Sequence, residues 1–247
     1  MNQISETGHA MNMINFQSLL TFIDSLGDLY NPSRECIKRE SLQTLLDNTQ
    51  ESFNSLYITQ SNYTLAVDDR IAAFEPLSKL VTRVFNSLKA SDSSVETDES
   101  VKTIVRKIQG KRATPLVSSE YTDSESTEVK EIKHKSTSQM SYNSRLENFE
   151  WFIIFLSKIP EYNPNEEDLK IESLKAYHTE LKAKNNLVMT AHSKMETERT
   201  QRNKMLYQPL TGIVDISIDI KNYIKSLFGA SSHQYKQIST LRFKVRL

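Results

Sequence analysis

The chain has 247 residues, of which only 5 are glycine and 1 is cysteine. Its 31 basic and 31 acidic residues cancel, so it carries no net charge that would attract nucleic acid or anionic membranes. One cysteine excludes an intramolecular disulfide and zinc sites built from several cysteines, and scarce glycine disfavours turn-rich β folds and glycine-rich phosphate loops.

The first residues do not resemble a targeting signal. No basic segment is followed by an apolar one, as in a secretory signal, and residues 1–14 are expected to be a flexible N-terminus. The longest apolar run, Trp151 to Leu156, is far shorter than a membrane span of about 20 residues. We therefore expect no transmembrane segment and a cytoplasmic location, with export that needs no signal peptide as the alternative.

The strongest signal is an internal repetition. Residues Tyr30 to Leu42 (YNPSRECIKRESL) and Tyr162 to Leu174 (YNPNEEDLKIESL) are identical at eight of thirteen positions. Further anchors lie on both sides, such as Asn15-Phe16 with Asn148-Phe149 and Pro76-Leu77 with Pro209-Leu210. The sequence predicts two tandem copies, a first repeat unit over 15–110 and a second over 142–247.

In each copy the apolar spacing predicts helices in the same order. An apolar helix, Phe16 to Leu29 in the first copy, ends before an Asn-Pro pair, and Asn31 and Pro32 suit the start of the next helix. That helix then meets no glycine or proline for over forty residues, until Pro76 ends or kinks it. A shorter amphipathic helix and a closing helix near Glu99 to Ile108 complete the copy.

Two segments depart from this repeated helical pattern. Residues 111–141 are rich in serine and threonine and lack apolar periodicity, so they are expected to be a flexible linker between the copies. Val214 to Ile220 alternates apolar and polar residues, as a strand would. Because the corresponding part of the first copy looks helical, we predict a helix there too.

These elements predict an all-α fold. Helices longer than forty residues are typical of bundles and coiled coils, since globular helices average three or four turns. We expect an elongated, coiled-coil-like helical bundle built from two tandem copies of a long-helix hairpin.

The sequence contains no pattern that indicates catalysis. No phosphate loop, dinucleotide fingerprint, zinc-protease motif or serine-hydrolase elbow is present, so we expect a protein that is not an enzyme and has no cofactor. Arg70 and Arg202 lie on the apolar stripes of the long helices, near Asp68, Asp69 and Glu198. A charge on such a stripe must be paired or reach out to solvent, and the candidate role is a structural latch between helices.

Both copies end in a basic cluster. The candidate anion-binding residues are Lys102, Arg106, Lys107, Lys111 and Arg112 in the first copy, and Lys236, Arg242, Lys244 and Arg246 in the second. The leading hypothesis is a non-enzymatic interaction or assembly protein that binds a protein partner or itself. The alternatives are a nucleic-acid-associated accessory protein that uses these basic ends, and a membrane-active, pore-forming type of helical protein that uses Trp151 to Leu156.

Overall fold

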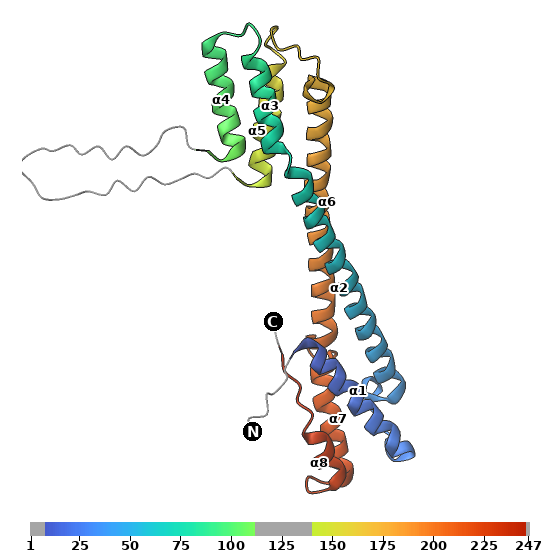
Figure 1. Ribbon diagram of the computed structural model, residues 1–247. Coiled ribbons are helices and arrows are strands. Elements are labelled where there is room, and N and C mark those ends of the chain that lie inside the picture. Colours follow the sequence, from blue (N-terminus) through green and yellow to red (C-terminus); the bar gives the residue numbers. More distant parts are fainter. Residues whose placement is uncertain (1–7, 112–139, 246–247) are drawn as a thin grey trace, which may run out of the picture. The chain divides into compact units, whose positions relative to one another are not determined.

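The computed structural model describes residues 8–111 and 140–245, and within these ranges every regular element is helical (Figure 1). Three single-turn 3₁₀ helices lie between the α-helices, as η1 (Gly27–Leu29), η2 (Glu35–Ile37) and η3 (Glu167–Leu169). The α-helices are α1 (His9–Leu26), α2 (Arg39–Phe74), α3 (Leu77–Lys89), α4 (Val95–Gln109), α5 (Tyr142–Leu156), α6 (Ile171–Tyr207), α7 (Ile213–Phe228) and α8 (His233–Ser239). The prediction of an all-α protein is confirmed for the described residues.

The chain folds into two compact units. One unit comprises residues 65–189, and the other comprises 1–64 together with 190–247. The divisions fall inside α2, which has 36 residues, and α6, which has 37. Each unit therefore draws on both of the segments 15–110 and 142–247 that the sequence analysis names as repeats.

In the unit of residues 65–189, α4 packs against both α3 and α5, and η3 packs against α3. The end of α2 and the beginning of α6 also supply core residues, among them Phe74 and Leu174. The apolar stripe of α3 places Leu77, Val81, Val84 and Leu88 in the core. This spacing of three and four residues puts the four side chains on one face of the helix.

The unit of residues 1–64 and 190–247 is assembled in a similar way. Here α7 packs against α1, α8 and η2. The beginning of α2 supplies Leu42, Leu46 and Phe53 to the core, and the end of α6 supplies Leu206. The stripe that α7 buries includes Ile213, Ile216, Ile220 and Ile224.

Burial follows the same pattern in elements that lie far apart in the sequence. The buried positions of α1 recur in α5 at one constant offset, as Phe16 with Phe149, Leu19 with Phe152, Leu20 with Ile153 and Ile23 with Leu156. Those of α3 recur in α7, again at a constant offset, as Leu77 with Ile213, Val81 with Ser217, Val84 with Ile220 and Leu88 with Ile224. At the sequence anchor, by contrast, Leu77 is fully buried but Leu210 is exposed, so Pro76-Leu77 and Pro209-Leu210 do not occupy matching environments.

The long helices begin later than their Asn-Pro pairs predict. Two buried tyrosines explain the delay: the Tyr30 hydroxyl donates to the Ile37 carbonyl over 2.7 Å, and the Tyr162 hydroxyl donates to the Leu169 carbonyl over 2.6 Å. Each bond closes a loop around a 3₁₀ turn, and an extended residue, Lys38 in the first loop, follows before the α-helix starts. The prediction that Asn31 and Pro32 begin the long helix is therefore wrong, since α2 begins at Arg39.

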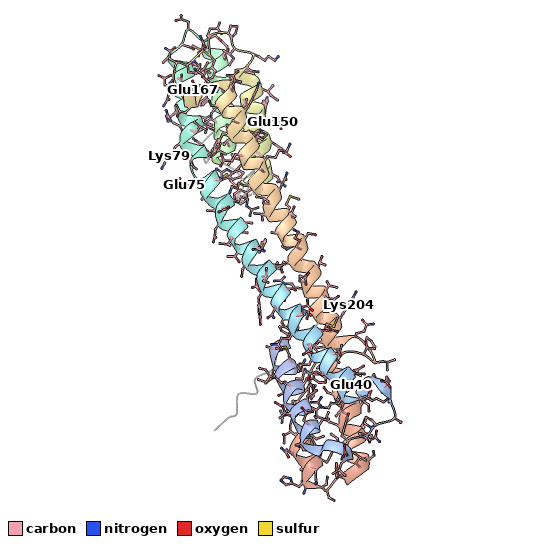
Figure 2. The ribbon with its side chains drawn as sticks, turned by 90° about the vertical axis from the view of Figure 1, so that its right-hand side faces the viewer. Glu40, Glu75, Lys79, Glu150, Glu167 and Lys204 are labelled. Atoms are coloured by element: carbon pink, nitrogen blue, oxygen red, sulfur yellow. The ribbon has the colours of Figure 1, made fainter. Side chains whose placement is uncertain are left out.

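Proline ends both long helices, but with different turns. Between α2 and α3 only Glu75 and Pro76 intervene, and Lys79 pairs with Glu75 over 3.6 Å at this junction (Figure 2). The turn between α6 and α7 is longer and places Leu210 at a φ of 66°, where its N–H donates to the Asp215 carboxylate over 2.9 Å. A side chain other than glycine is uncommon in this left-handed region.

The two ambiguous apolar segments are both helical. The alternating segment Val214 to Ile220 lies within α7, as predicted. The run from Trp151 to Leu156 lies in α5, where Phe152, Ile153 and Leu156 are buried, whereas Trp151 and Ile154 are exposed. Within residues 8–111 and 140–245, no helix combines the length and the apolar character needed to cross a membrane.

Candidate functional site

Arg70 lies in a polar cluster inside the unit of residues 65–189. Its guanidinium carbon lies 3.9 Å from the centre of the Tyr142 ring, a cation–π contact between α2 and α5. Its Nη1 donates to the Asn185 side-chain oxygen over 3.2 Å, and the Asn185 amide in turn donates to Asn143 over 2.7 Å. Arg70 therefore links three helices through an aromatic ring and a buried amide.

Arg145, on α5, contacts Phe74, the aromatic neighbour of Tyr142. Its guanidinium carbon is 5.3 Å from the centre of the Phe74 ring, and its Nη2 donates to the Phe74 carbonyl over 3.4 Å. The rings of Phe74 and Tyr142 meet edge to face, with centroids 4.8 Å apart. One cluster thus contains two cations and two aromatic rings. The sequence did not indicate that Arg145 belongs to it.

Neither arginine is neutralised by an acid within the described part of the chain. Asp69 pairs with Lys184 over 2.8 Å, and the Nε atoms of Arg70 and Arg145 are buried without a hydrogen-bond partner among the described residues. A buried donor without a partner costs free energy, so the cation–π contacts and the remaining bonds must offset this cost. Arg70 thus bonds to Asn185 and not to Asp68 or Asp69, the acids near it in the sequence.

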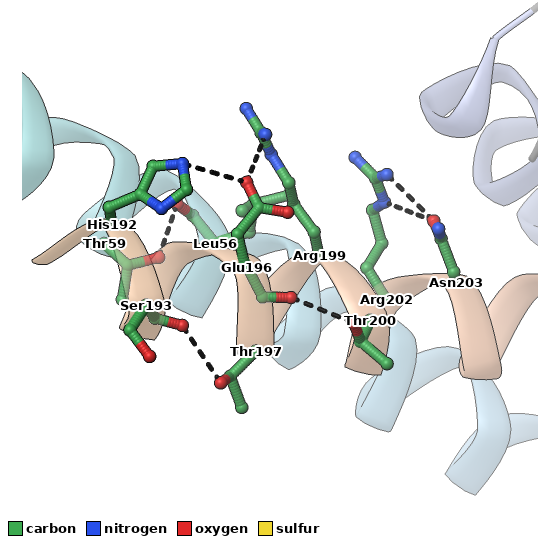
Figure 3. A network of polar contacts seen from close by, with 10 residues as sticks. All are labelled: Leu56, Thr59, His192, Ser193, Glu196, Thr197, Arg199, Thr200, Arg202 and Asn203. Atoms are coloured by element: carbon green, nitrogen blue, oxygen red, sulfur yellow. Dashed lines mark hydrogen bonds and ion pairs between the residues drawn. The ribbon is translucent and has the colours of Figure 1, made fainter. Parts of the chain in front are cut away.

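Arg202 has different partners. It lies on α6 in the unit of residues 1–64 and 190–247, and its Nε and Nη2 donate to the neighbouring Asn203 side chain over 3.2 and 2.8 Å (Figure 3). Burial lowers the pKa of the Arg202 guanidinium. Earlier in the same helix, Glu196 accepts from Arg199 over 2.6 Å and lies 3.8 Å from His192 (Figure 3). Arg202 therefore makes a local bond within one helix, unlike Arg70.

The structure describes four members of the first basic cluster: Lys102, Arg106 and Lys107 lie in the C-terminal half of α4, and Lys111 follows the helix. Lys102 pairs with Glu99 over 2.6 Å, and Lys107 lies 4.8 Å from the centre of the Trp151 ring. Gly110, at a φ of 68°, ends the helix, and the Lys111 N–H donates to the Arg106 carbonyl over 2.9 Å. Arg112 lies outside the described residues. Two of the four side chains are thus already engaged by an acid or an aromatic ring.

The second basic cluster is divided between α8 and the extended chain after it. Lys236 lies in α8, whereas Arg242 and Lys244 belong to the segment that follows the helix, and Arg246 lies outside the described residues. The first cluster and the second lie in different compact units. The structure therefore shows two separate sets of basic residues.

Two asparagines of α1 hold that extended segment, a role sequence analysis did not predict. The buried Asn12 side chain donates to the Lys244 carbonyl over 2.7 Å and accepts from the Lys244 N–H over 3.1 Å. Asn15 donates to the Arg242 carbonyl over 2.8 Å. The available signal was an asparagine four residues before Phe16, on the buried face of an apolar helix.

Burial raises the pKa of Tyr177 to about 12, and its hydroxyl donates to the Ala73 carbonyl over 2.6 Å. A hollow of about 340 Å³ is lined by residues that include Tyr30 and the ion-paired Asp24 and Arg39. Among residues 8–111 and 140–245, no group of three or more histidine, cysteine or acidic side chains is placed to hold a metal ion.

No protein-family model, curated protein or solved structure matches this chain.

Proposed function

We propose that the protein is a non-enzymatic interaction or assembly component, whose chain is a tandem duplication with coiled-coil-like long helices. The observation that carries the proposal of an interaction is on α5, where Trp151 is 44% exposed and Ile154 is 53% exposed. They lie three residues apart, so they share one face of the helix. Exposed tryptophan is a favoured anchor in protein interfaces, because it contributes a large apolar area.

The surroundings of Trp151 suit a partner contact. Lys107 covers one part of the ring by a cation–π contact, which restrains the indole before any partner arrives. A restrained side chain loses less conformational entropy on binding. The same helix buries Phe152 and Leu156 on its opposite side, so the exposed pair stands on a firmly packed element.

The duplication is supported by the matched burial of α1 with α5 and of α3 with α7, and by the two equivalent tyrosine-closed loops. The ion pairs Lys38–Glu35 and Lys170–Glu167 also occupy equivalent positions in these loops, each at 2.6 Å. In the unit of residues 65–189, Asp69 contacts Lys184 and Ala73 contacts Tyr177, so α2 and α6 run antiparallel there, which supports the coiled-coil-like character.

The test compares the full chain with a Trp151→Ser/Ile154→Ser variant in sedimentation velocity and in quantitative capture from a native lysate. Because Trp151 is the only tryptophan, a blue shift of its fluorescence reports directly on contact with a partner. Ile14→Ser, which removes another exposed apolar side chain, from α1, is the matched control. We expect the first variant alone to lose association; unchanged association in both variants would refute a role for this face.

The two alternatives give different outcomes. Nucleic-acid binding requires retention in a filter assay that falls steeply with salt, and that is lost when the basic residues are replaced. Membrane action requires dye release from anionic vesicles, for which buried Phe152 and Leu156 would have to leave the core. Neither behaviour is expected for an assembly component.

A further inference from the structure

Two ion pairs join the halves of the chain at matching places, but with their charges exchanged. In the unit of residues 1–64 and 190–247, Arg34 beside η2 pairs with Asp219 of α7 over 2.5 Å. In the unit of residues 65–189, Asp168 of η3 pairs with Arg83 of α3. In the first pair the loop is positive and the helix negative, and in the second pair the signs are reversed.

The helix members of the two pairs occupy equivalent positions, whereas the loop members lie two residues apart in the aligned loops, where Arg34 corresponds to Glu166 and Asp168 to Cys36. Arg83 and Asp219 are separated along the chain by the same offset that relates all four pairs of buried residues in α3 and α7. Arg34 and Asp168 lie on the two tyrosine-closed loops, and each loop packs against the helix that carries its ion-pair partner, η2 on α7 and η3 on α3. The same loop-to-helix contact is thus made twice, each time between one half of the chain and the other.

We propose that these charges specify which half pairs with which, an inference that rests on the duplication proposed above. If two copies of residues 8–111 paired with each other, Arg34 would face Arg83 at both contacts. If two copies of residues 140–245 paired, Asp168 would face Asp219. Only mixed pairing brings opposite charges together, so the charges act against association of like halves. The charges would not prevent two chains from exchanging complete halves, because each pair formed by the exchange would still be mixed.

A third ion pair between the halves does not contribute to this discrimination. Lys184 pairs with Asp69 over 2.8 Å. By the offset that relates Tyr30 to Tyr162, like-half pairing would place Asp69 opposite Ser52, and Lys184 opposite Gln201. Like-half pairing would therefore remove the attraction between Asp69 and Lys184 without bringing two like charges together. This pair therefore serves as an internal control.

The experiment uses the full chain with a protease site inserted between residues 112 and 139. After purification the chain is cut, unfolded in urea and refolded, and the masses of the assemblies are measured by native mass spectrometry. We expect the wild-type halves to re-form mixed pairs. Wild-type halves that separate, or that pair with like halves, would refute the mixed pairing itself, independently of the charge proposal.

Three variants then test the charges. Arg83→Asp alone should shift the population towards pairs of the first half, because the new carboxylate would attract Arg34 and repel Asp168. Arg83→Asp/Asp168→Arg keeps both mixed contacts attractive and makes both like-half contacts attractive too. It should therefore move the mixture towards random pairing, in which about half of the pairs are mixed. The control Asp69→Lys/Lys184→Asp should remain mixed.

A second measurement covers the intact chain. Arg83→Asp should lower the urea midpoint at low salt. The midpoint should return towards the wild-type value at high salt, because exposed charges are screened within about 10 Å at 0.1 M salt. The double variant should match the wild type at both salt concentrations. The proposal is overturned if the cut double variant still forms only mixed pairs, since packing would then select the partner, or if Arg83→Asp is insensitive to salt.

Discussion

Replacing the loop-closing tyrosines by phenylalanine should destabilise the protein by similar amounts at two places. Tyr30→Phe removes the hydroxyl that donates to the Ile37 carbonyl, and Tyr162→Phe removes the one that donates to the Leu169 carbonyl. Both rings stay buried, so the apolar contacts are kept and each substitution removes one hydrogen bond.

The size of the destabilisation follows from the hydrogen bond that each backbone carbonyl loses. A net intramolecular hydrogen bond is worth about 0.5–1.5 kcal/mol, and a buried acceptor left without a partner costs about 1–3 kcal/mol. We expect a loss of about 1–2 kcal/mol for each substitution. The two sites share no partner, so the costs should add in the double variant to within about 0.5 kcal/mol.

The effect should also depend on pH. Burial raises the pKa of Tyr30 and of Tyr162, so the folded state favours the neutral hydroxyl. The resulting stabilisation is complete below about pH 10, the ordinary pKa of tyrosine, and is lost as the pH rises towards the folded-state pKa. The difference in the free energy of unfolding between the wild type and the variants should therefore decrease above about pH 10.

Urea unfolding followed by circular dichroism from about pH 7 to about pH 11 measures both effects. Tyr57→Phe is the control, because Tyr57 is 55% exposed, and it should change the free energy of unfolding by less than about 0.5 kcal/mol. A cost at Tyr30 and Tyr162 no larger than at Tyr57, or an unchanged alkaline slope in the double variant, would refute the proposed role of these hydroxyls.

Five other substitutions test four separate features. Leu210→Asn should raise stability by about 0.5–1 kcal/mol in thermal unfolding, because asparagine tolerates a φ of 66° better than leucine. Gly212→Ala should lower it by about 1–3 kcal/mol, since the added Cβ would lie 2.7 Å from a backbone nitrogen in the preceding turn. Asn12→Ala should cost about 1–3 kcal/mol and speed tryptic removal of the C-terminal segment, whose backbone groups lose their partner. Arg70→Met should cost about 1–3 kcal/mol in urea unfolding by stranding its buried asparagine partner, whereas Arg202→Met should cost less than about 1 kcal/mol; equal costs would show that both arginines act in the same way.

The sequence by itself determined the helices and their buried faces. Spacings of three and four residues are local properties of one helix, so the stripe through Leu77, Val81 and Val84 could be recognised without knowing what covers it. Val214 to Ile220 was predicted to be helical despite its alternation, by comparison with the amphipathic segment after Pro76, and it lies in α7.

The tertiary structure decided how the long helices begin and what the candidate residues contact. Asn31 and Pro32 carry a local signal for a helix start, but a hydrogen bond from Tyr30 to the backbone seven residues later postpones the start to Arg39. Arg70 has acids close by in the sequence, yet its partner is Asn185, which only folding brings near.

The assignment of partners also required the fold. An apolar stripe indicates that one face of a helix is buried, but it does not indicate which other helix packs against that face. Packing shows that the residues following position 64 associate with α5 and the beginning of α6, and that α1 associates with α7. Each compact unit therefore combines segments from both halves of the chain, because neither half alone supplies all the residues that close either core.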